Sequence, residues 1–264
     1  MKTPRSAYLH IPFCYKRCFY CDFTIIPLGK NNKPREKDRS IIENYLNLIH
    51  KEISLSPKGS PLSTIYIGGG TPSLLAPKEI SSLIEKLDNV FGIQDGAEIT
   101  LEVDPSTFSN DFLEKLIEVG INRISLGGQS FDDQVLCELG RTHTSEQLQK
   151  SCQQLDEKLC NGEICSWSLD LIQNLPKQNS ISWEHQLINA ISTNAPHLSI
   201  YDLSIEPGTV FEALRNRGKL DLPSEEIAYE INALTNQVLI DAGFSRYEIS
   251  SFAMPCHSSR HNRM

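Results

Sequence analysis

The sequence predicts an α/β protein with a parallel sheet and helices outside it. Strand-like and helix-like stretches alternate along the whole chain of 264 residues and form six strand–helix units in succession. Polar and glycine-rich residues gather at or just after the predicted strands, which is where parallel α/β folds place their functional sites. Periodicity alone leaves open whether this sheet is flat or curled.

The predicted strands are short runs of apolar and β-branched residues at positions 7–11, 64–67, 98–103, 123–126, 166–172 and 197–203. The predicted helices repeat apolar residues at one-turn spacing over positions 41–55, 77–91, 110–119, 181–193 and 224–242. A further helix is expected after Thr144, which forms a capping box with Gln147. Residues 27–40 are expected to form a basic loop, and residues 247–252 an extended segment.

Composition excludes several classes of protein. The net charge of −8 has the wrong sign for a protein that binds nucleic acid by neutralising phosphates. No apolar stretch approaches the roughly 20 residues that a membrane-spanning helix needs. The first residues do not resemble a signal peptide, so the eight cysteines are expected to be reduced thiols rather than a disulfide framework. We therefore expect a cytoplasmic protein without a transmembrane segment.

Three cysteines, Cys14, Cys18 and Cys21, follow the first predicted strand with the spacing Cys-x3-Cys-x2-Cys. Three thiolates on one loop can all reach one inorganic centre. A fully protein-ligated iron–sulfur cluster takes four cysteines and a structural zinc ion takes four ligands, but the next cysteine here is Cys137. Three ligands on a [4Fe–4S] cluster would leave one iron open for a small molecule. The alternatives are a zinc knuckle or a chance group of thiols.

Short motifs surround these cysteines and follow most of the predicted strands. They are Tyr8-x-His10-Ile11-Pro12-Phe13-Cys14, Cys18-Phe19-Tyr20-Cys21-Asp22-Phe23, Gly68-Gly69-Gly70-Thr71-Pro72-Ser73, Glu102-x-Asp104-Pro105, Gln129-Ser130-Phe131, Leu139-Gly140-Arg141-x-His143, Leu169-Asp170-Leu171-Ile172 and Glu206-Pro207-Gly208-Thr209. With the cysteine spacing, they resemble the radical S-adenosylmethionine (SAM) superfamily. Within it they are similar to the oxygen-independent coproporphyrinogen III oxidase-like family, and in particular to its haem chaperone branch, HemW.

This resemblance implies a partial (β/α)6 barrel, open at one side. Members of the family continue into a further C-terminal domain, so the chain looks truncated relative to them. On this basis we expect residues 1–223 to form the radical SAM core barrel. Residues 224–264 would contribute a helix and a strand that begin the truncated C-terminal region.

The implied cofactors are a [4Fe–4S] cluster on the three cysteines and SAM on the open iron. An electron from the cluster would cleave SAM and release a 5′-deoxyadenosyl radical, with the protein providing orientation and shielding. The residues that the resemblance assigns to SAM are Tyr8, Tyr20, Gly69, Gly70, Thr71, Glu102, Gln129, Arg141 and Asp170. Gly70, Thr71, Gln129, Arg141 and Asp170 would belong to a second SAM site.

Each of these residues also has a purely structural reading. The glycine run lets backbone amides approach a ligand closely, but it could equally be a plain strand-to-helix turn. Glu102 could accept hydrogen bonds from ribose hydroxyls or cap the following turn. Arg141 and Asp170 could form an ion pair with each other, and the two tyrosines could pack in the core.

Two functions of different class remain. The first is a haem chaperone that binds haem and delivers it to acceptor proteins, with cluster and SAM in a supporting role. The second is an oxidase that decarboxylates two propionates of coproporphyrinogen III in porphyrin biosynthesis. The family's oxidases carry a fourth cysteine two residues after the third, where this chain has Phe23, and a longer segment before the tyrosine equivalent to Tyr8. Both features favour the chaperone.

The expected partners are haem or a porphyrin, haem-acceptor proteins, and an electron donor such as flavodoxin or ferredoxin. Whether the chain is also an enzyme stays open, because SAM cleavage makes it an oxidoreductase only if a substrate is converted. Residues 259–264 resemble the start of a motif that the chaperone branch associates with haem binding. His261 is therefore a candidate haem ligand, with a frayed terminus as the alternative.

Overall fold

Six parallel strands, taken in chain order, form the centre of the fold. The computed structural model describes residues 4–29, 36–107 and 109–264. Its eight-stranded sheet has the order β1-β4-β5-β6-β7-β8-β10-β9. The strands are β1 (Ser6–Ile11), β4 (Leu62–Gly69), β5 (Ile93–Val103), β6 (Arg123–Gln129), β7 (Ser166–Gln173), β8 (His197–Asp202), β9 (Ser245–Arg246) and β10 (Ser251–Ala253). β10 runs antiparallel to β8 and to β9, and a separate parallel pair joins β2 (Phe13–Cys14) to β3 (Ile26–Pro27).

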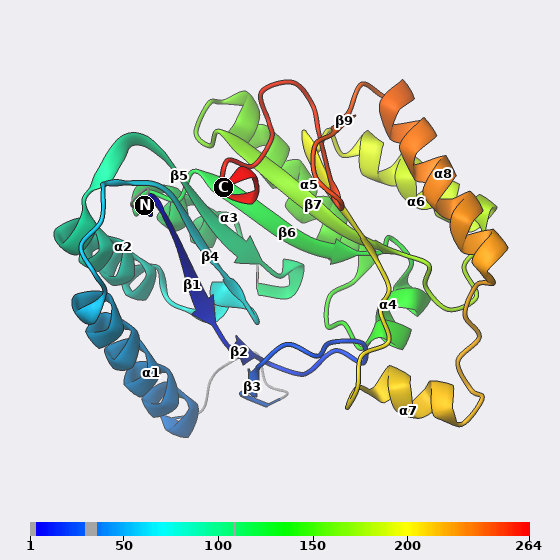
Figure 1. Ribbon diagram of the computed structural model, residues 1–264, viewed down its shortest axis with the longest axis horizontal. Coiled ribbons are helices and arrows are strands. Elements are labelled where there is room, and N and C mark those ends of the chain that lie inside the picture. The colour runs from blue at the N-terminus through cyan, green and yellow to red at the C-terminus, as the bar shows by residue number, and fades with distance from the viewer. Residues whose placement is uncertain (1–3, 30–35, 108) are drawn as a thin grey trace.

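The helices lie around the outside of the sheet, as Figure 1 shows. They are α1 (Glu36–Leu55), α2 (Pro77–Phe91), α3 (Asn110–Glu118), α4 (Asp133–Leu139), α5 (Ser145–Cys160), α6 (Ser180–Ser192), α7 (Val210–Asn216) and α8 (Glu225–Asp241). Three short 3-10 turns, η1 (Pro72–Leu74), η2 (Pro105–Thr107) and η3 (His261–Arg263), complete the elements. Within the described part of the chain, no helix combines the length and the hydrophobicity that crossing a membrane requires.

The predicted fold class is confirmed: a mostly parallel sheet with surrounding helices. The capping box of Thr144 and Gln147 is also confirmed, since each side chain bonds the backbone of the other residue at the start of α5. These features could be predicted because they depend on residues that are close in sequence.

Several local predictions were wrong. The helix expected from residue 41 begins at Glu36, so part of the predicted loop 27–40 is helical; residues 30–35 of that loop lie outside the described residues. The start of α1 is polar, so apolar periodicity could not reveal it. The helices α4 and α7 were not predicted, because each has only seven residues and shows no full amphipathic repeat. Of the predicted extended segment 247–252, residues 251–252 do lie in strand β10, but residues 248–250 bend between β9 and β10.

The two faces of the parallel sheet differ in character. On the outer face, side chains such as Ile67, Leu101, Ile124 and Leu169 are fully buried in the main hydrophobic core beneath the helices. Because side chains alternate along a strand, the residues between them face inward. These inner residues are mostly polar: Thr64, Thr100, Glu102, Ser125, Ser168, Asp170 and Ser199. The strand pairing places them side by side, so the sheet presents a polar inner face.

The last residues of the chain cross this inner face near the N-terminal ends of the strands. Glu98, at the start of the parallel part of β5, accepts hydrogen bonds from the backbone N–H groups of Arg260 (3.0 Å) and His261 (3.1 Å). His257 Nδ1 lies 3.1 Å from Ser166 Oγ at the start of β7. Figure 1 shows this segment in red, ending in front of the middle of the sheet. Residues 224–264 therefore extend and cover the same sheet, while the division of the chain at residue 223 remains a prediction.

Candidate functional site

A cavity of about 550 Å³ opens at the C-terminal ends of the parallel strands, on the polar face of the sheet. It brings together eleven of the thirteen residues that the sequence singled out, and those eleven are Cys14, Cys18, Cys21, Tyr20, Gly69, Gly70, Thr71, Glu102, Gln129, Arg141 and Asp170. They come from the loop after β1 and from the ends of β4, β5, β6 and β7 or the segments that follow. The fold therefore brings together residues that are up to about 150 positions apart in sequence. This follows because neighbouring parallel strands all end at the same edge of the sheet.

The cysteine loop is held by its own backbone and by one arginine. Cys14 ends β2, and its carbonyl accepts a hydrogen bond from the Leu28 amide at 2.8 Å. Arg17 Nη1 donates to the carbonyls of Cys21 (3.0 Å) and Phe23 (2.8 Å), which closes the second half of the loop. All three cysteines are half-buried free thiols at the cavity wall. The loop thus presents three thiols to one space.

Three thiols at one cavity wall suit a [4Fe–4S] cluster, since each of its irons takes its own thiolate. Among the described residues, no group of three cysteine, histidine, aspartate or glutamate side chains is placed to hold a single metal ion.

Burial favours the protonated thiol at Cys14 and at Cys21 until a metal centre binds. Burial raises the pKa of Cys14 to about 11, although the Thr71 hydroxyl, 3.4 Å from its sulfur, acts in the opposite direction. Burial also raises the pKa of Cys21. Metal ions deprotonate the thiols that ligate them, so cluster binding must release protons here.

The glycine run forms the wall beside Cys14. A Cβ atom on Gly70 would lie 2.7 Å from the Phe13 carbonyl oxygen and 2.9 Å from Cys14 Sγ, closer than real contacts allow. Gly69 has a φ of +120°, and a Cβ there would lie 2.7 Å from His10 Nδ1. Glycine is therefore required at both positions by the close approach of β4 to the cysteine loop. The bare backbone thus lets β4 pack directly against the cysteine loop at the cavity wall.

Two buried carboxylates face the cavity from β5 and β7. Glu102 accepts hydrogen bonds from the Gly69 amide at Oε2 and from the Tyr66 hydroxyl at Oε1, both at 2.9 Å, and burial raises its pKa. Asp170 accepts a hydrogen bond from Ser125 at Oδ2 (3.0 Å), but no described donor reaches its buried Oδ1 with hydrogen-bond geometry. Burial raises the pKa of Asp170 to about 7. A buried acceptor without a partner at a cavity wall fits a polar ligand.

Arg141 pairs with a residue that the sequence analysis had not assigned to the site. Its Nη2 donates to Asp104 Oδ2 at 2.6 Å and to the Gly127 carbonyl at 2.9 Å, and its Nη1 lies 3.7 Å from Cys18 Sγ. Although burial opposes it, this guanidinium lowers the pKa of Asp104 below its usual range. The partner of Arg141 is thus Asp104 and not Asp170. The sequence signals for Asp104 were its place directly after a predicted strand and its position in the motif Glu102-x-Asp104-Pro105.

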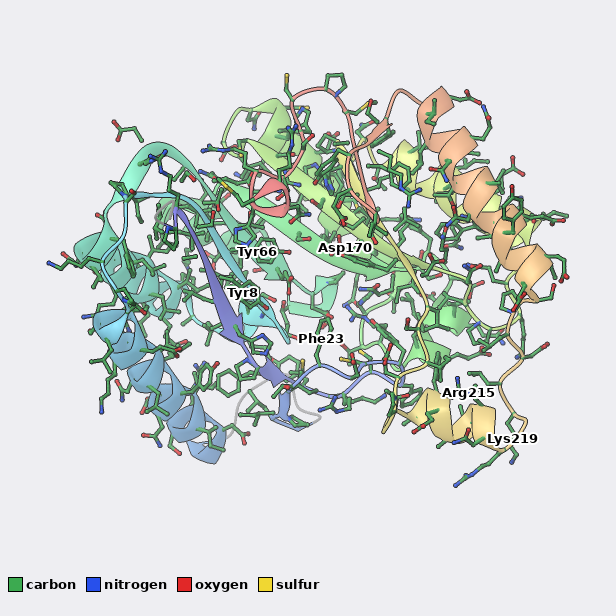
Figure 2. The ribbon with its side chains drawn as sticks, viewed as in Figure 1. Tyr8, Phe23, Tyr66, Asp170, Arg215 and Lys219 are labelled. Carbon is green, nitrogen blue, oxygen red and sulfur yellow. The ribbon has the colours of Figure 1, made fainter. Side chains whose placement is uncertain are left out.

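Tyr8 and His261 lie away from the other site residues. Tyr8 is 51% exposed on the edge strand β1, where its hydroxyl lies 3.1 Å from His10 Nδ1. His261 lies near the N-terminal ends of the strands, whereas the cavity lies at their C-terminal ends. Its Nδ1 is 3.0 Å from Thr64 Oγ1. Tyr20, by contrast, lines the cavity and packs against Phe211 of α7 with ring centres 6.5 Å apart. Figure 2 shows Tyr8 and Tyr66 on neighbouring strands, with Asp170 on a strand further along the sheet.

Comparison with known proteins identifies the family. The sequence profile of the radical SAM superfamily matches residues 8–179.

The chain belongs to the radical SAM superfamily.

The relatives of this radical SAM chain include three bacterial proteins named heme chaperone HemW. The one from Synechocystis sp. is 38% identical and covers 99% of this chain, the one from Bacillus subtilis is 36% identical and covers 98%, and the one from Escherichia coli is 35% identical and covers 98%. The chain spans 62%, 66% and 65% of their respective lengths. Among solved structures, coproporphyrinogen III oxidase (HemN) from Escherichia coli matches with a TM-score of 0.80 at 30% identity, covering 96% of this chain and 56% of that one.

Membership of the superfamily implies a [4Fe–4S] cluster and SAM, and the site fits both. Cys14, Cys18 and Cys21 would hold the cluster, and the glycine wall and the unpartnered oxygen of Asp170 leave space and an acceptor for a polar ligand. When bound, such a cluster supplies the electron that cleaves SAM. The protein's part is to hold the ligands, to seat them between β4 and β7, and to keep the buried carboxylates aimed at them.

Replacing Cys18 with alanine is expected to abolish cluster assembly, because two thiols cannot hold a [4Fe–4S] cluster. The measurement is the iron and sulfide content per chain after anaerobic reconstitution, together with the visible absorption of the cluster. Cys160→Ala is the matched control, because Cys160 is an exposed thiol at the end of α5 that does not line the cavity. A Cys18→Ala protein with full iron and sulfide content would contradict the assignment.

Asp170→Asn is expected to stabilise the cofactor-free protein increasingly as the pH rises. The folded-state pKa of Asp170, about 7, lies above the pKa of this group in the unfolded chain. The wild type therefore loses stability as the pH rises from the unfolded pKa to the folded pKa. The loss is about 1.4 kcal/mol per pH unit between pH 5 and pH 6.5, and the asparagine variant does not suffer it. Urea unfolding of both proteins across this range measures the difference. A difference that is constant with pH would show that Asp170 ionises normally.

Proposed function

We propose that the chain is the radical SAM part of a haem chaperone of the HemW type, which binds haem and delivers it to acceptor proteins. The observation that carries this proposal is the match to relatives with that name over almost the whole chain, at 33–38% identity in five bacteria. An electron donor such as flavodoxin or ferredoxin would reduce the cluster. The chain spans only part of the length of these relatives, so the activity of the whole protein is part of the proposal.

The end of the cysteine loop supports the chaperone over the oxidase. After Cys21 the chain continues with Asp22 and Phe23, both exposed, and Phe23 is 58% accessible. The oxidase branch that the sequence resembles has a cysteine at the position of Phe23. An exposed aromatic ring at the mouth of the cavity is chemically a different surface from a thiol, and it suits contact with an apolar partner.

The charge of the cavity also disfavours the oxidase. Its described lining includes six carboxylates, and they are Asp22, Glu102, Asp104, Asp170, Asp202 and Glu206. The cations in the same lining are Lys16 and Arg141, and Arg141 is already paired with Asp104. Coproporphyrinogen III carries several anionic propionates, which those of the six carboxylates that are ionised would repel. The positively charged sulfonium and amino groups of SAM suit it better.

In this proposal each cavity residue has a defined task toward SAM. The Gly69–Gly70 segment would contact the amino end of SAM, Glu102 would accept hydrogen bonds from the ribose hydroxyls, and Tyr20 would pack against the ligand. Gln129, Arg141 and Asp170, with Gly70 and Thr71, would form a second SAM site, and Tyr8 would close the first from β1. His261 remains the candidate for an axial haem ligand, with Nε2 as the nitrogen not engaged by Thr64.

The decisive experiment separates the two functions in one anaerobic reaction. The reconstituted protein is mixed with SAM, a reductant and coproporphyrinogen III, and the products are separated by chromatography. We expect 5′-deoxyadenosine without conversion of the porphyrinogen. In a second measurement, haem loaded onto the protein should pass to an apo-haemoprotein.

Protoporphyrinogen among the products would make the chain an oxidase and overturn the proposal. A protein that cleaves SAM but neither binds haem nor passes it on would also contradict the chaperone function, while leaving membership of the superfamily intact.

A further inference from the structure

Tyr66 touches the cofactor site only through another residue. It lies on β4, two residues before the glycine run, and its side chain is on the inner face of the sheet. It is not among the residues that line the cavity. Its hydroxyl donates a 2.9 Å hydrogen bond to Oε1 of Glu102, which does line the cavity. None of the sequence motifs had marked Tyr66 as functional.

Both hydrogen bonds to Glu102 come from β4. Tyr66 holds Oε1 and the Gly69 amide holds Oε2, so both oxygens of the carboxylate are anchored to β4. A carboxylate held at both oxygens cannot rotate, and each oxygen keeps a further lone pair for a ligand. Hydrogen bonds to an ionised acceptor are stronger than neutral ones. The orientation of Glu102 toward the cavity therefore depends on the position of the Tyr66 hydroxyl.

The ring of Tyr66 itself packs against two other rings. Its centre lies 6.0 Å from that of Tyr8, with an angle of 26° between the rings. Its centre lies 5.1 Å from that of His261, with an angle of 35°. Aromatic rings at these distances attract each other in offset arrangements. Tyr66 is thus fixed by packing as well as by its hydrogen bond.

His261 is in turn fastened to two strands. Its Nδ1 lies 3.0 Å from Thr64 Oγ1 on β4, and its backbone N–H donates to Glu98 on β5 at 3.1 Å. Ser259 also donates to Glu98, at 3.2 Å. The segment 259–261 therefore cannot move without moving the ring that packs on Tyr66.

We propose that Tyr66 is a positioning residue for Glu102 and that His261 holds Tyr66 in place, so that the C-terminal segment 259–261 is mechanically coupled to the SAM site. This inference rests on the proposed binding of SAM by Glu102. In this inference His261 has a positioning role, although it lies at the end of the sheet remote from the cysteines. The coupling passes through three successive contacts. The ring of His261 packs on Tyr66, the Tyr66 hydroxyl bonds Glu102, and Glu102 bonds the Gly69 amide.

A purely structural role for Tyr66 would give different results from a positioning role. Phenylalanine at this position keeps the ring between Tyr8 and His261 and removes only the hydroxyl. If Tyr66 merely fills space, Tyr66→Phe binds SAM as the wild type does. If it positions Glu102, the variant binds SAM more weakly although its ring packing and its cluster are unchanged.

The test is the dissociation constant for SAM, measured by equilibrium dialysis on the protein with its cluster reconstituted. We expect Tyr66→Phe to raise this constant about tenfold, the usual scale for losing a hydrogen bond to a charged group. In a Glu102→Gln background the same substitution should have no further effect, because the carboxylate it positions is gone. Tyr229→Phe is the control, since Tyr229 is 77% exposed on α8.

The role of His261 is tested by a pair of variants. His261→Ala removes the ring from Tyr66 and should weaken SAM binding by about fivefold, within the range that aromatic pairs contribute. His261→Phe restores a ring and should restore affinity to within about twofold, although phenylalanine can neither bond Thr64 nor ligate haem. His185→Ala, on the exposed face of α6, is the control.

The outcomes separate this inference from the proposed function. A wild-type protein that assembles its cluster but binds no SAM contradicts the proposed site, and this inference with it. A wild type that binds SAM, with Tyr66→Phe equally tight, contradicts the positioning role alone. The positioning role is also contradicted if Tyr66→Phe raises the dissociation constant for SAM as much in the Glu102→Gln background as in the wild type. Equal losses for His261→Ala and His261→Phe would contradict the ring contact as the means of coupling.

Discussion

The polar inner face of the parallel sheet is the constraint on which the rest of the structure depends. Polar groups taken away from water need partners, and the two ends of this face meet that need differently. Near the N-terminal ends of the strands, the carboxylate of Glu98 takes three hydrogen bonds from residues 259–261. At the C-terminal ends, no donor in the described part of the chain meets hydrogen-bond geometry at the buried Oδ1 of Asp170. One end of the face is closed by the chain itself, and the other is left for a ligand.

The residues of the cofactor site are held in place by close backbone packing and by two arginine side chains. The cysteine loop is closed by Arg17 on two carbonyls, and the glycine wall approaches so closely that a single Cβ would collide with Cys14. Arg141 is held by Asp104 and reaches the sulfur of Cys18. These contacts place three thiols and the Arg141 guanidinium around one cavity before any cofactor arrives, which is what a reaction that must exclude water and side reactions requires.

The sequence predicted what depends on neighbouring residues and missed what depends on distant ones. The alternation of strands and helices, the cap at Thr144 and the gathering of polar residues after strands all follow from local pattern, and the structure has each of them. The partner of Arg141 is 37 residues away and the contact of His261 with Thr64 spans 197, so no local signal could reveal either. Tyr66 escaped notice because a tyrosine in a strand is ordinarily a packing residue. The helices α4 and α7 were missed because they are too short to show a repeat of apolar residues at helical spacing.

We infer that three thiols hold a four-iron cluster with one iron left for SAM. Mössbauer spectroscopy of the protein reconstituted with ⁵⁷Fe can test this, because it distinguishes the irons of a cluster by their ligands. Adding SAM is expected to change the signal of one iron in four and to leave the other three as they were. A spectrum in which SAM alters none of the irons, or in which the protein holds no four-iron cluster at all, would contradict it.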